Sequence, residues 1–173
     1  MPTQPEVALF ETLRRRGRLY DLSLHYPIPM PAFHHGHVEV DIHGRYDRVQ
    51  HVVVEYDGEF WPGGPADVSD AHKTRALLHA GYLVVRVRDH CDALRLRQPG
   101  LLQVLIEAGR TFEEHQASAV IASITDWLDH REYREASYPV IPEDAAPTPP
   151  NRRPREPRTT GVRFDFPPGE KDD

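Results

Sequence analysis

The distribution of proline is the feature that most limits how this chain can fold. Nine of its 17 prolines lie among the last 35 of the 173 residues, from position 139 onward. Arginines and acidic residues are interspersed with them, and large apolar residues are few. Such a segment buries too little apolar surface to offset the entropy of ordering. We therefore expect one folded domain over residues 1–138 and a disordered tail over residues 139–173.

Residues 1–138 alternate between helical and extended patterns. Apolar residues recur at helical spacing between Pro5 and Gly17, and a second helix is expected from Ser69 or Asp70 to Ala80. Extended segments are expected over residues 19–28, 38–42, 50–56 and 83–88, and further helices over residues 101–107 and 112–128. This order predicts an α/β fold in which one mixed sheet is flanked by helices.

Composition excludes several classes of protein. The single cysteine, Cys91, excludes an internal disulfide framework and an all-cysteine zinc site. No apolar run approaches the ~18 residues that span a bilayer, and the first residues lack the pattern of a signal peptide. We therefore expect a cytoplasmic protein with no membrane partner. The net charge of −6 argues against coating nucleic acid by bulk electrostatics, but not against carboxylates gathered around a metal.

Acidic side chains gather on one face of two neighbouring predicted strands. Asp41 shares a face with Glu39 and His43, and Glu55 shares a face with Asp57. If the strands pair as a hairpin, Asp41 and Glu55 lie side by side, with Asp57 one pleat further on. Buried carboxylates need neutralising, and Mg²⁺ or Mn²⁺ suits oxygen ligands of this kind. The alternative is a set of solvent-facing acids. The apolar residues expected on the opposite face of the first strand are Val38, Val40 and Ile42.

Five short motifs occur in order along the chain: PEVALF from Pro5, VEVDI ending at Ile42, EYDGEFW from Glu55, DAHK ending at Lys73 and GYLVVRVR from Gly81. Together they resemble the PD-(D/E)xK nuclease superfamily, and most closely the very-short-patch-repair-type endonucleases and related uncharacterised domains. They cover roughly residues 4–96. The resemblance implies a restriction endonuclease-like domain, with a mixed sheet flanked by helices, that hydrolyses phosphodiester bonds in DNA.

The resemblance also implies roles for particular residues. Asp41 and Glu55 would bind Mg²⁺ or Mn²⁺, which activates water and stabilises charge on the scissile phosphate. The superfamily's lysine two residues after the glutamate is here Asp57, a departure shared by the subset with the EYDG motif, and we expect Asp57 to be one of the catalytic residues. Lys73, the only lysine before the tail, is then the candidate cation, and Glu6 would orient a metal-bound water or shape the site. The structural alternatives are an exposed helical lysine and a first-turn acid favoured by the helix dipole.

One position departs from the related sequences. They often place a histidine after the tryptophan, where it can serve as general acid or base. Here Pro62 follows Trp61 and cannot take that role. His72 could substitute from the following helix, but we expect that it does not.

Two other functions stay open. The first is a catalytically inactive relative that uses the same fold to bind DNA or a partner protein. The second is a zinc metallohydrolase built on the dense histidine set His34, His35, His37 and His43. Arginines that could contact phosphates are Arg14, Arg15, Arg16, Arg18, Arg86, Arg88, Arg95 and Arg97. Since no separate DNA-binding module is evident, a protein partner could supply targeting.

Overall fold

The computed structural model describes residues 1–58, 65–107, 112–130 and 140–141. Its elements are α1 (Gln4–Arg16), β1 (Leu19–Pro29), β2 (His37–Tyr46), β3 (Gln50–Asp57), α2 (Pro65–His79), β4 (Leu83–Asp89), β5 (Leu101–Ile106), α3 (Glu114–His130) and β6 (Val140–Ile141). Within the described residues the strands form one six-stranded sheet in sequence order. The first three strands are antiparallel, and β3 to β6 are parallel. The expected α/β architecture with a mixed, helix-flanked sheet is confirmed.

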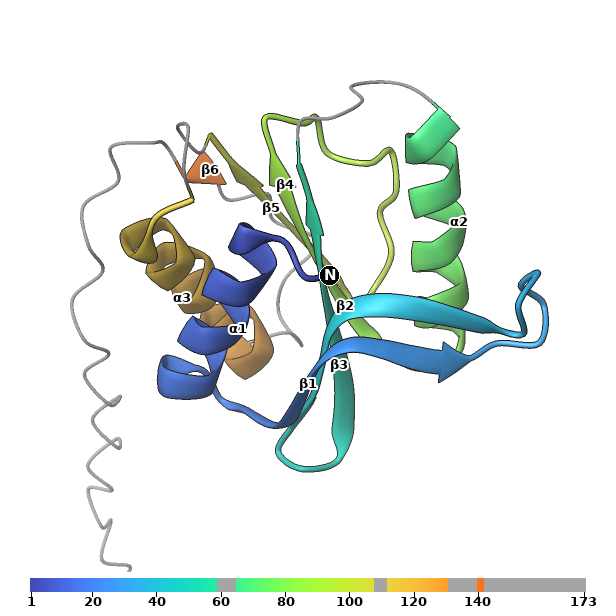
Figure 1. Ribbon diagram of the computed structural model, residues 1–173, viewed down its shortest axis with the longest axis horizontal. Coiled ribbons are helices and arrows are strands. Elements are labelled where there is room, and N and C mark those ends of the chain that lie inside the picture. Colours follow the sequence, from blue (N-terminus) through green and yellow to red (C-terminus); the bar gives the residue numbers. More distant parts are fainter. Residues whose placement is uncertain (59–64, 108–111, 131–139, 142–173) are drawn as a thin grey trace, which may run out of the picture.

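Helices cover both faces of the sheet (Figure 1): α1 and α3 lie on one side and α2 on the other. Leu9 of α1 and Ile124 of α3 belong to the core cluster on the first side, and Leu77 of α2 belongs to the cluster on the second. Because β3, β4 and β5 are covered on both faces, their sequences are nearly continuous apolar runs, as expected for buried parallel strands. None of the helices in the described residues is long and apolar enough to cross a membrane.

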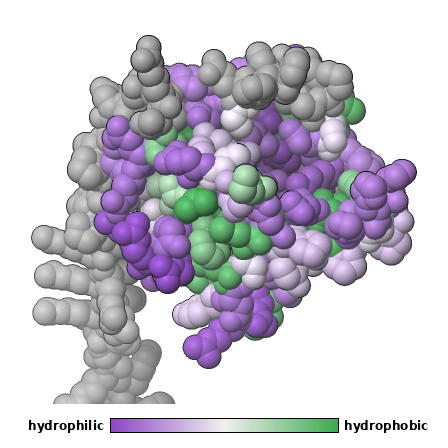
Figure 2. Space-filling view, in the orientation of Figure 1, coloured by the Kyte–Doolittle hydropathy of each residue, from purple (hydrophilic) through white to green (hydrophobic). Residues whose placement is uncertain are grey.

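The face of the molecule drawn in Figure 2 is mainly hydrophilic, with its largest apolar area near the centre and smaller apolar areas elsewhere. The exposed large apolar residues in the described part of the chain are Met1, Val7, Tyr20, Tyr26, Val49 and Val68. Most apolar side chains are therefore used in the two cores.

The beginning of α1 follows from its sequence. The Thr3 side chain accepts a hydrogen bond from the Glu6 backbone, and the Glu6 side chain accepts one from the Thr3 backbone. This capping box satisfies two backbone N–H groups that the first turn would leave unpaired. The helix ends before Gly17, as the sequence predicts.

Two predicted helices differ from the structure. Residues 101–107, expected to be helical, form strand β5 at Leu101–Ile106. A short apolar run does not distinguish a buried strand from a buried helix by its period, and here pairing with β4 decides for the strand. Helix α2 begins at Pro65 rather than at Ser69 or Asp70. Proline is suited to a first helical position because its missing N–H would be unpaired there.

The ends of the predicted domain differ in one detail. Val140 and Ile141, placed in the tail by sequence, form β6 and pair with β5. The remainder of the predicted tail lies outside the described residues. A loop is also expected from sequence over residues 62–65; its first three residues lie outside the described residues, and Pro65 begins α2 instead.

The expected single apolar face of β2 is wrong. Val38 and Val40 pack in the core cluster on the α2 side, whereas Ile42 packs in the cluster on the α1 side. The neighbouring strand β1 is irregular, with positive φ angles at Asp21 and His25 and a register shift between Tyr20 and Ser23. The apolar side chains of β2 therefore switch from one face of the sheet to the other between Val40 and Ile42. Asp41 lies at this switch.

Candidate active site

Asp41 lies where β2 separates from β3. The paired residues of the two strands run from Tyr46↔Gln50 to Ile42↔Val54, so Asp41 comes directly after the last pair. Its Oδ2 accepts a hydrogen bond of 2.8 Å from the backbone N–H of Tyr56. The carboxylate thus takes the place of a backbone acceptor, which holds the side chain beside β3 and next to Glu55.

Glu55 is the more deeply buried carboxylate. Its side chain is only 5% exposed, and Lys73 Nζ donates to its Oε2 at 2.8 Å. The other oxygen, Oε1, is buried and accepts no hydrogen bond from the described residues. Buried polar atoms are nearly always partnered, so an unpaired carboxylate oxygen marks a position where a further positive or donating group would be stabilised.

The electrostatics of the two carboxylates favour a cation. Burial raises the pKa of Glu55 to about 7, although Lys73 opposes the rise, and the charge of Asp41 adds to it. Burial also raises the pKa of Asp41, with the hydrogen bond from Tyr56 acting in the opposite direction. Each group therefore keeps its negative charge at a cost that a bound divalent ion would relieve.

Lys73 places a positive charge beside Glu55, as the sequence predicts. It comes from α2 and makes the ion pair with Glu55 described above, with its side chain 21% exposed. A lysine on a helix thus reaches the carboxylate from the α2 side of the sheet. Lys73 therefore lies beside Glu55, and it is largely buried rather than an exposed helical lysine; its role in a reaction stays a prediction.

Glu6 combines a structural role with a place near these groups. It closes the capping box of α1, and its Oε2 also lies 2.9 Å from His25 Nε2. Burial raises its pKa, but hydrogen bonds from His25 and Thr3 outweigh this and lower the pKa overall. Its negative charge contributes to the raised pKa of Asp41. Glu6 is therefore both a helix-capping acid and an ionised neighbour of the Asp41–Glu55 pair.

Asp57 has a different environment from the other predicted site residues. Its oxygens accept hydrogen bonds from Arg86 Nη2 and, at 2.7 Å, from Arg86 Nε, and Arg88 Nη1 lies 3.4 Å away. Arg86 also pairs with Asp70 at 3.2 Å. The carboxylate is thus neutralised within an ion-pair cluster that joins β3, β4 and α2.

Several predicted phosphate-binding arginines are used inside the protein. Arg86 and Arg88 are 1% and 3% exposed, so the hypothesis that they contact DNA phosphates is wrong. Arg14 and Arg18 are exposed and pair with Glu11 and Asp129. The remaining members of that set, Arg15, Arg16, Arg95 and Arg97, are also exposed.

The histidine set does not form a metal centre in the described residues. His35 and His37 are exposed in and after the β1–β2 connection, with ring centroids 6.2 Å apart. His43 is buried elsewhere, hydrogen-bonded to His51 at 2.9 Å and stacked on Tyr26. Across the described ranges, no three His, Cys, Asp or Glu side chains form a group that could hold a metal ion by themselves.

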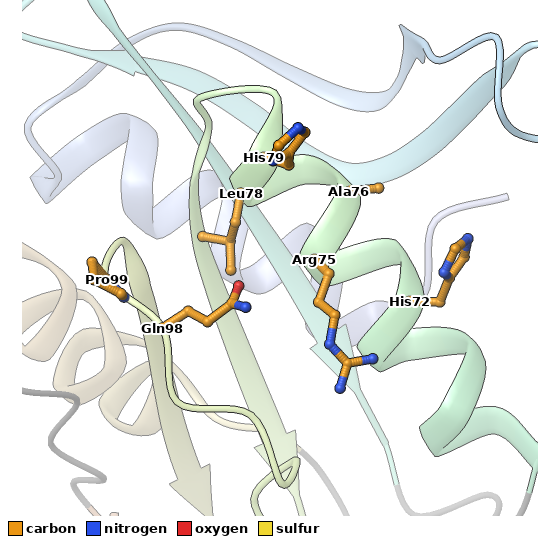
Figure 3. Close-up of a pocket in the computed structure, with 7 residues that line it drawn as sticks. All are labelled: His72, Arg75, Ala76, Leu78, His79, Gln98 and Pro99. Atoms are coloured by element: carbon orange, nitrogen blue, oxygen red, sulfur yellow. The ribbon is translucent and has the colours of Figure 1, made fainter.

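His72 is not among the groups around Glu55. Its ring packs against Phe33, with centroids 5.2 Å apart. Figure 3 shows it on the outer side of α2, at a groove that Arg75 and His79 line with Gln98 and Pro99 of the connection before β5. Trp61 and Pro62 lie outside the described residues.

Two contacts near the site were not predicted from the sequence. The first is the ion pair of Arg86 with Asp57, which could have been suspected, because a charged residue within a valine-rich strand needs a buried partner. His25 gave no signal, since its place beside Glu6 depends on an irregular strand and on the packing of α1.

No protein-family model matches the chain, and neither a curated protein nor a solved structure shows significant similarity to it. The function therefore has to be inferred from the geometry of this site.

Proposed function

We propose that this chain is a divalent-metal-dependent endonuclease that hydrolyses phosphodiester bonds in DNA with a PD-(D/E)xK-like site. One observation carries the proposal: the buried Oε1 of Glu55 has no partner among the described residues, next to Asp41 and beside the ion pair with Lys73. A pair of raised-pKa carboxylates with a neighbouring lysine is typical of a functional site.

The residues present fit Mg²⁺ or Mn²⁺. Asp41 and Glu55 would hold the ion through their oxygens. Mg²⁺ is usually bound by only one or two carboxylates and keeps waters or substrate phosphates as its other ligands, so a third protein ligand is not needed. When bound, the ion supplies charge stabilisation at the phosphate and a more acidic water.

The other side chains prepare the site. Lys73 neutralises Glu55 through one donor, and its partly exposed ammonium keeps further donors for a phosphate oxygen. Glu6, held ionised beside Asp41, accepts a proton from the attacking water or orients it. Asp57 acts indirectly. It pairs with Arg86, and Arg86 in turn pairs with Asp70 on the helix that carries Lys73.

The order of elements supports the same proposal. The acids lie on α1, β2 and β3 and the lysine lies on α2, which is the order that the sequence motifs imply. DNA as substrate rests on that resemblance. With a net charge of −6 and no separate DNA-binding module evident in the sequence, we expect weak sequence specificity from the chain alone and targeting by a protein partner.

The proposal is tested by cleavage of supercoiled plasmid and of single-stranded DNA with Mg²⁺ or Mn²⁺. Wild type is compared with Asp41→Ala, Glu55→Gln and the matched control Glu11→Gln, an acid on α1 whose side chain is 40% exposed and pairs with Arg14. We expect cleavage by wild type and by the control, and a loss of roughly 10²-fold or more in both site variants.

Failure would take one of two forms. A folded wild type that binds DNA but cleaves none with either metal would support the inactive binding module instead. Cleavage that survives both site substitutions would place the reaction elsewhere or in a contaminant.

A further inference from the structure

His25 is held between two carboxylates at the edge of the proposed site. Its Nε2 lies 2.9 Å from Oε2 of Glu6, and its Nδ1 lies 3.4 Å from Oε1 of Glu39. The side chain is 29% exposed, whereas that of Glu6 is 11% exposed. Because Glu6 Oε2 is an acceptor, Nε2 carries a hydrogen and donates it.

The backbone at His25 is unusual. Its φ of 49° places a histidine in the left-handed region, which is unfavourable for a residue other than glycine. Such conformations persist where the surroundings hold them, and they are concentrated at functional sites. In this backbone conformation the His25 ring contacts Glu6. The contact lies across from the position where β2 leaves β3.

The Glu6 carboxylate is held through one of its oxygens. The Thr3 N–H, at 2.9 Å, and His25 Nε2 both donate to the same oxygen, Oε2. The other oxygen, Oε1, accepts no hydrogen bond from the described part of the chain and has lone pairs for a further donor. Two donors on one oxygen orient the carboxylate plane, and they keep Glu6 ionised next to Asp41.

We propose that His25 is a positioning residue of this site, which fixes the Glu6 carboxylate so that its free oxygen holds the attacking water beside Asp41, while Glu39 orients the His25 ring. The inference rests on the proposed nuclease function. It gives the site a histidine that acts through Glu6, in a chain where Pro62 follows Trp61 and His72 packs against Phe33.

Two substitutions separate the hydrogen bond from the backbone strain. In His25→Asn, the asparagine tolerates a left-handed backbone, but its side chain is too short to reach Glu6. His25→Gln is long enough to place an amide N–H near the position of Nε2. The control is His34→Ala, which removes an exposed histidine from the connection between β1 and β2.

The first readout does not depend on activity. The pKa of Glu6 is measured in the full chain by ¹³C NMR of its carboxyl group. We expect the pKa to rise in His25→Asn and to stay near the wild-type value in His25→Gln and His34→Ala. An unchanged pKa in a folded His25→Asn would overturn the proposal and leave the nuclease function standing.

The second readout is steady-state cleavage of plasmid DNA with Mg²⁺. We expect His25→Asn to lower kcat by about 10- to 100-fold with little change in KM, and the acid limb of its pH–rate profile to move to higher pH. His25→Gln should recover most of the rate.

Equal impairment of the two His25 variants, or a wild-type kcat in His25→Asn, would overturn the role of His25 while Asp41→Ala still tests the nuclease. A wild type that cleaves no DNA would overturn the proposed function, and the role of His25 in cleavage with it.

Discussion

At the scale of single residues, the site depends on a buried carboxylate whose charge is disfavoured by its burial. Glu55 directly follows the valines of β3 with its side chain 5% exposed, one oxygen paired with Lys73 and the other unpaired among the described residues. Core packing alone would favour an apolar residue there, because burying a paired charge often costs as much as it returns. The arrangement is explained if a cation joins the pair when the protein works.

The raised pKa of Glu55 predicts how the stability of the metal-free protein depends on pH. The folded-state pKa of about 7 lies above the ordinary value of 4.5, so the folded state binds this proton more tightly. The resulting stability, about 3 kcal/mol, is complete below pH 4.5 and is lost as the pH rises through 7. Urea unfolding from pH 5 to pH 8 should show this fall.

Glu55→Gln should flatten that dependence, leaving the smaller part due to Asp41, whose pKa is also raised. The exposed control Glu11→Gln should keep the wild-type slope. Identical slopes in wild type and Glu55→Gln would show that burial does not raise the pKa of Glu55.

Lys73 should be required as a lysine. Lys73→Met leaves Glu55 buried without its partner, and we expect a loss of cleavage of roughly 10²-fold or more. Lys73→Arg should not restore it, because a guanidinium differs from a compact ammonium in shape and donor geometry. Arg75→Met removes an exposed charge from the same helix and should leave cleavage unchanged. Full activity in Lys73→Met would limit the lysine to a structural role.

At the scale of elements, one ion-pair cluster joins β3, β4 and α2. Arg86 on β4 bonds Asp57 on β3, and it also reaches the Thr74 hydroxyl and the Asp70 backbone of α2. This cluster fixes the helix that carries Lys73 relative to the strand that carries Glu55. Asp57, expected to be catalytic, thus has a structural task in the observed geometry.

Asp57→Asn should therefore destabilise the fold by about 3 kcal/mol or more, since it removes the main charge partner of a buried arginine. Asp21→Asn breaks an exposed pair with Arg45 and should cost no more than about 1 kcal/mol. Both are measured by urea unfolding. Wild-type stability in an Asp57→Asn variant that has lost Mg²⁺-dependent cleavage would instead make Asp57 a direct participant.

Strand β5 contains a second group of buried polar contacts, the hydrogen bonds of Gln103. Gln103 is fully buried, and its amide accepts from Leu94 N at 2.7 Å and donates to the carbonyl oxygens of Leu94 and Leu96. Gln103→Leu leaves the Leu94 N–H unpaired, at a cost of about 1–3 kcal/mol. Hydrogen exchange at Leu94 should accelerate, while the exposed Gln98→Leu should leave it unchanged. Unaltered exchange in Gln103→Leu would contradict this role.

These elements show which parts were accessible from sequence. Local signals predicted α1 between Pro5 and Gly17, and the valine-rich β3 and β4. The period of Leu101–Ile106 could not distinguish a strand from a helix, because a segment buried on both faces shows no alternation. The change of side between Val40 and Ile42 depends on the irregular partner strand β1, which no short-range pattern in β2 records.

The candidate site divides in the same way. Asp41, Glu55 and Lys73 were predicted from motif order, and the structure brings them together. The partners of Asp57 and the place of His25 beside Glu6 arise from contacts between residues 29 and 19 positions apart. Those contacts need the folded sheet, so spacing along the chain did not predict them.

At the scale of the whole molecule, the site is assembled at one end of the sheet from both of its faces. Glu6 comes from α1 on one side and Lys73 from α2 on the other, with Asp41 and Glu55 between them where β2 leaves β3 (Figure 1). The exposed histidines of the β1–β2 connection form a separate place where a metal could be sought. The two places make different predictions about where an ion binds.

The central claim is that Asp41 and Glu55 hold a divalent ion, and paramagnetic broadening by Mn²⁺ tests it most directly. Small additions of Mn²⁺ to the ¹⁵N-labelled chain should broaden the amide signals of Asp41, Glu55 and Tyr56 first, and Asp41→Ala should abolish this selectivity. Broadening centred on His34, His35 and His37, or broadening at Tyr56 that persists in Asp41→Ala, would contradict the account.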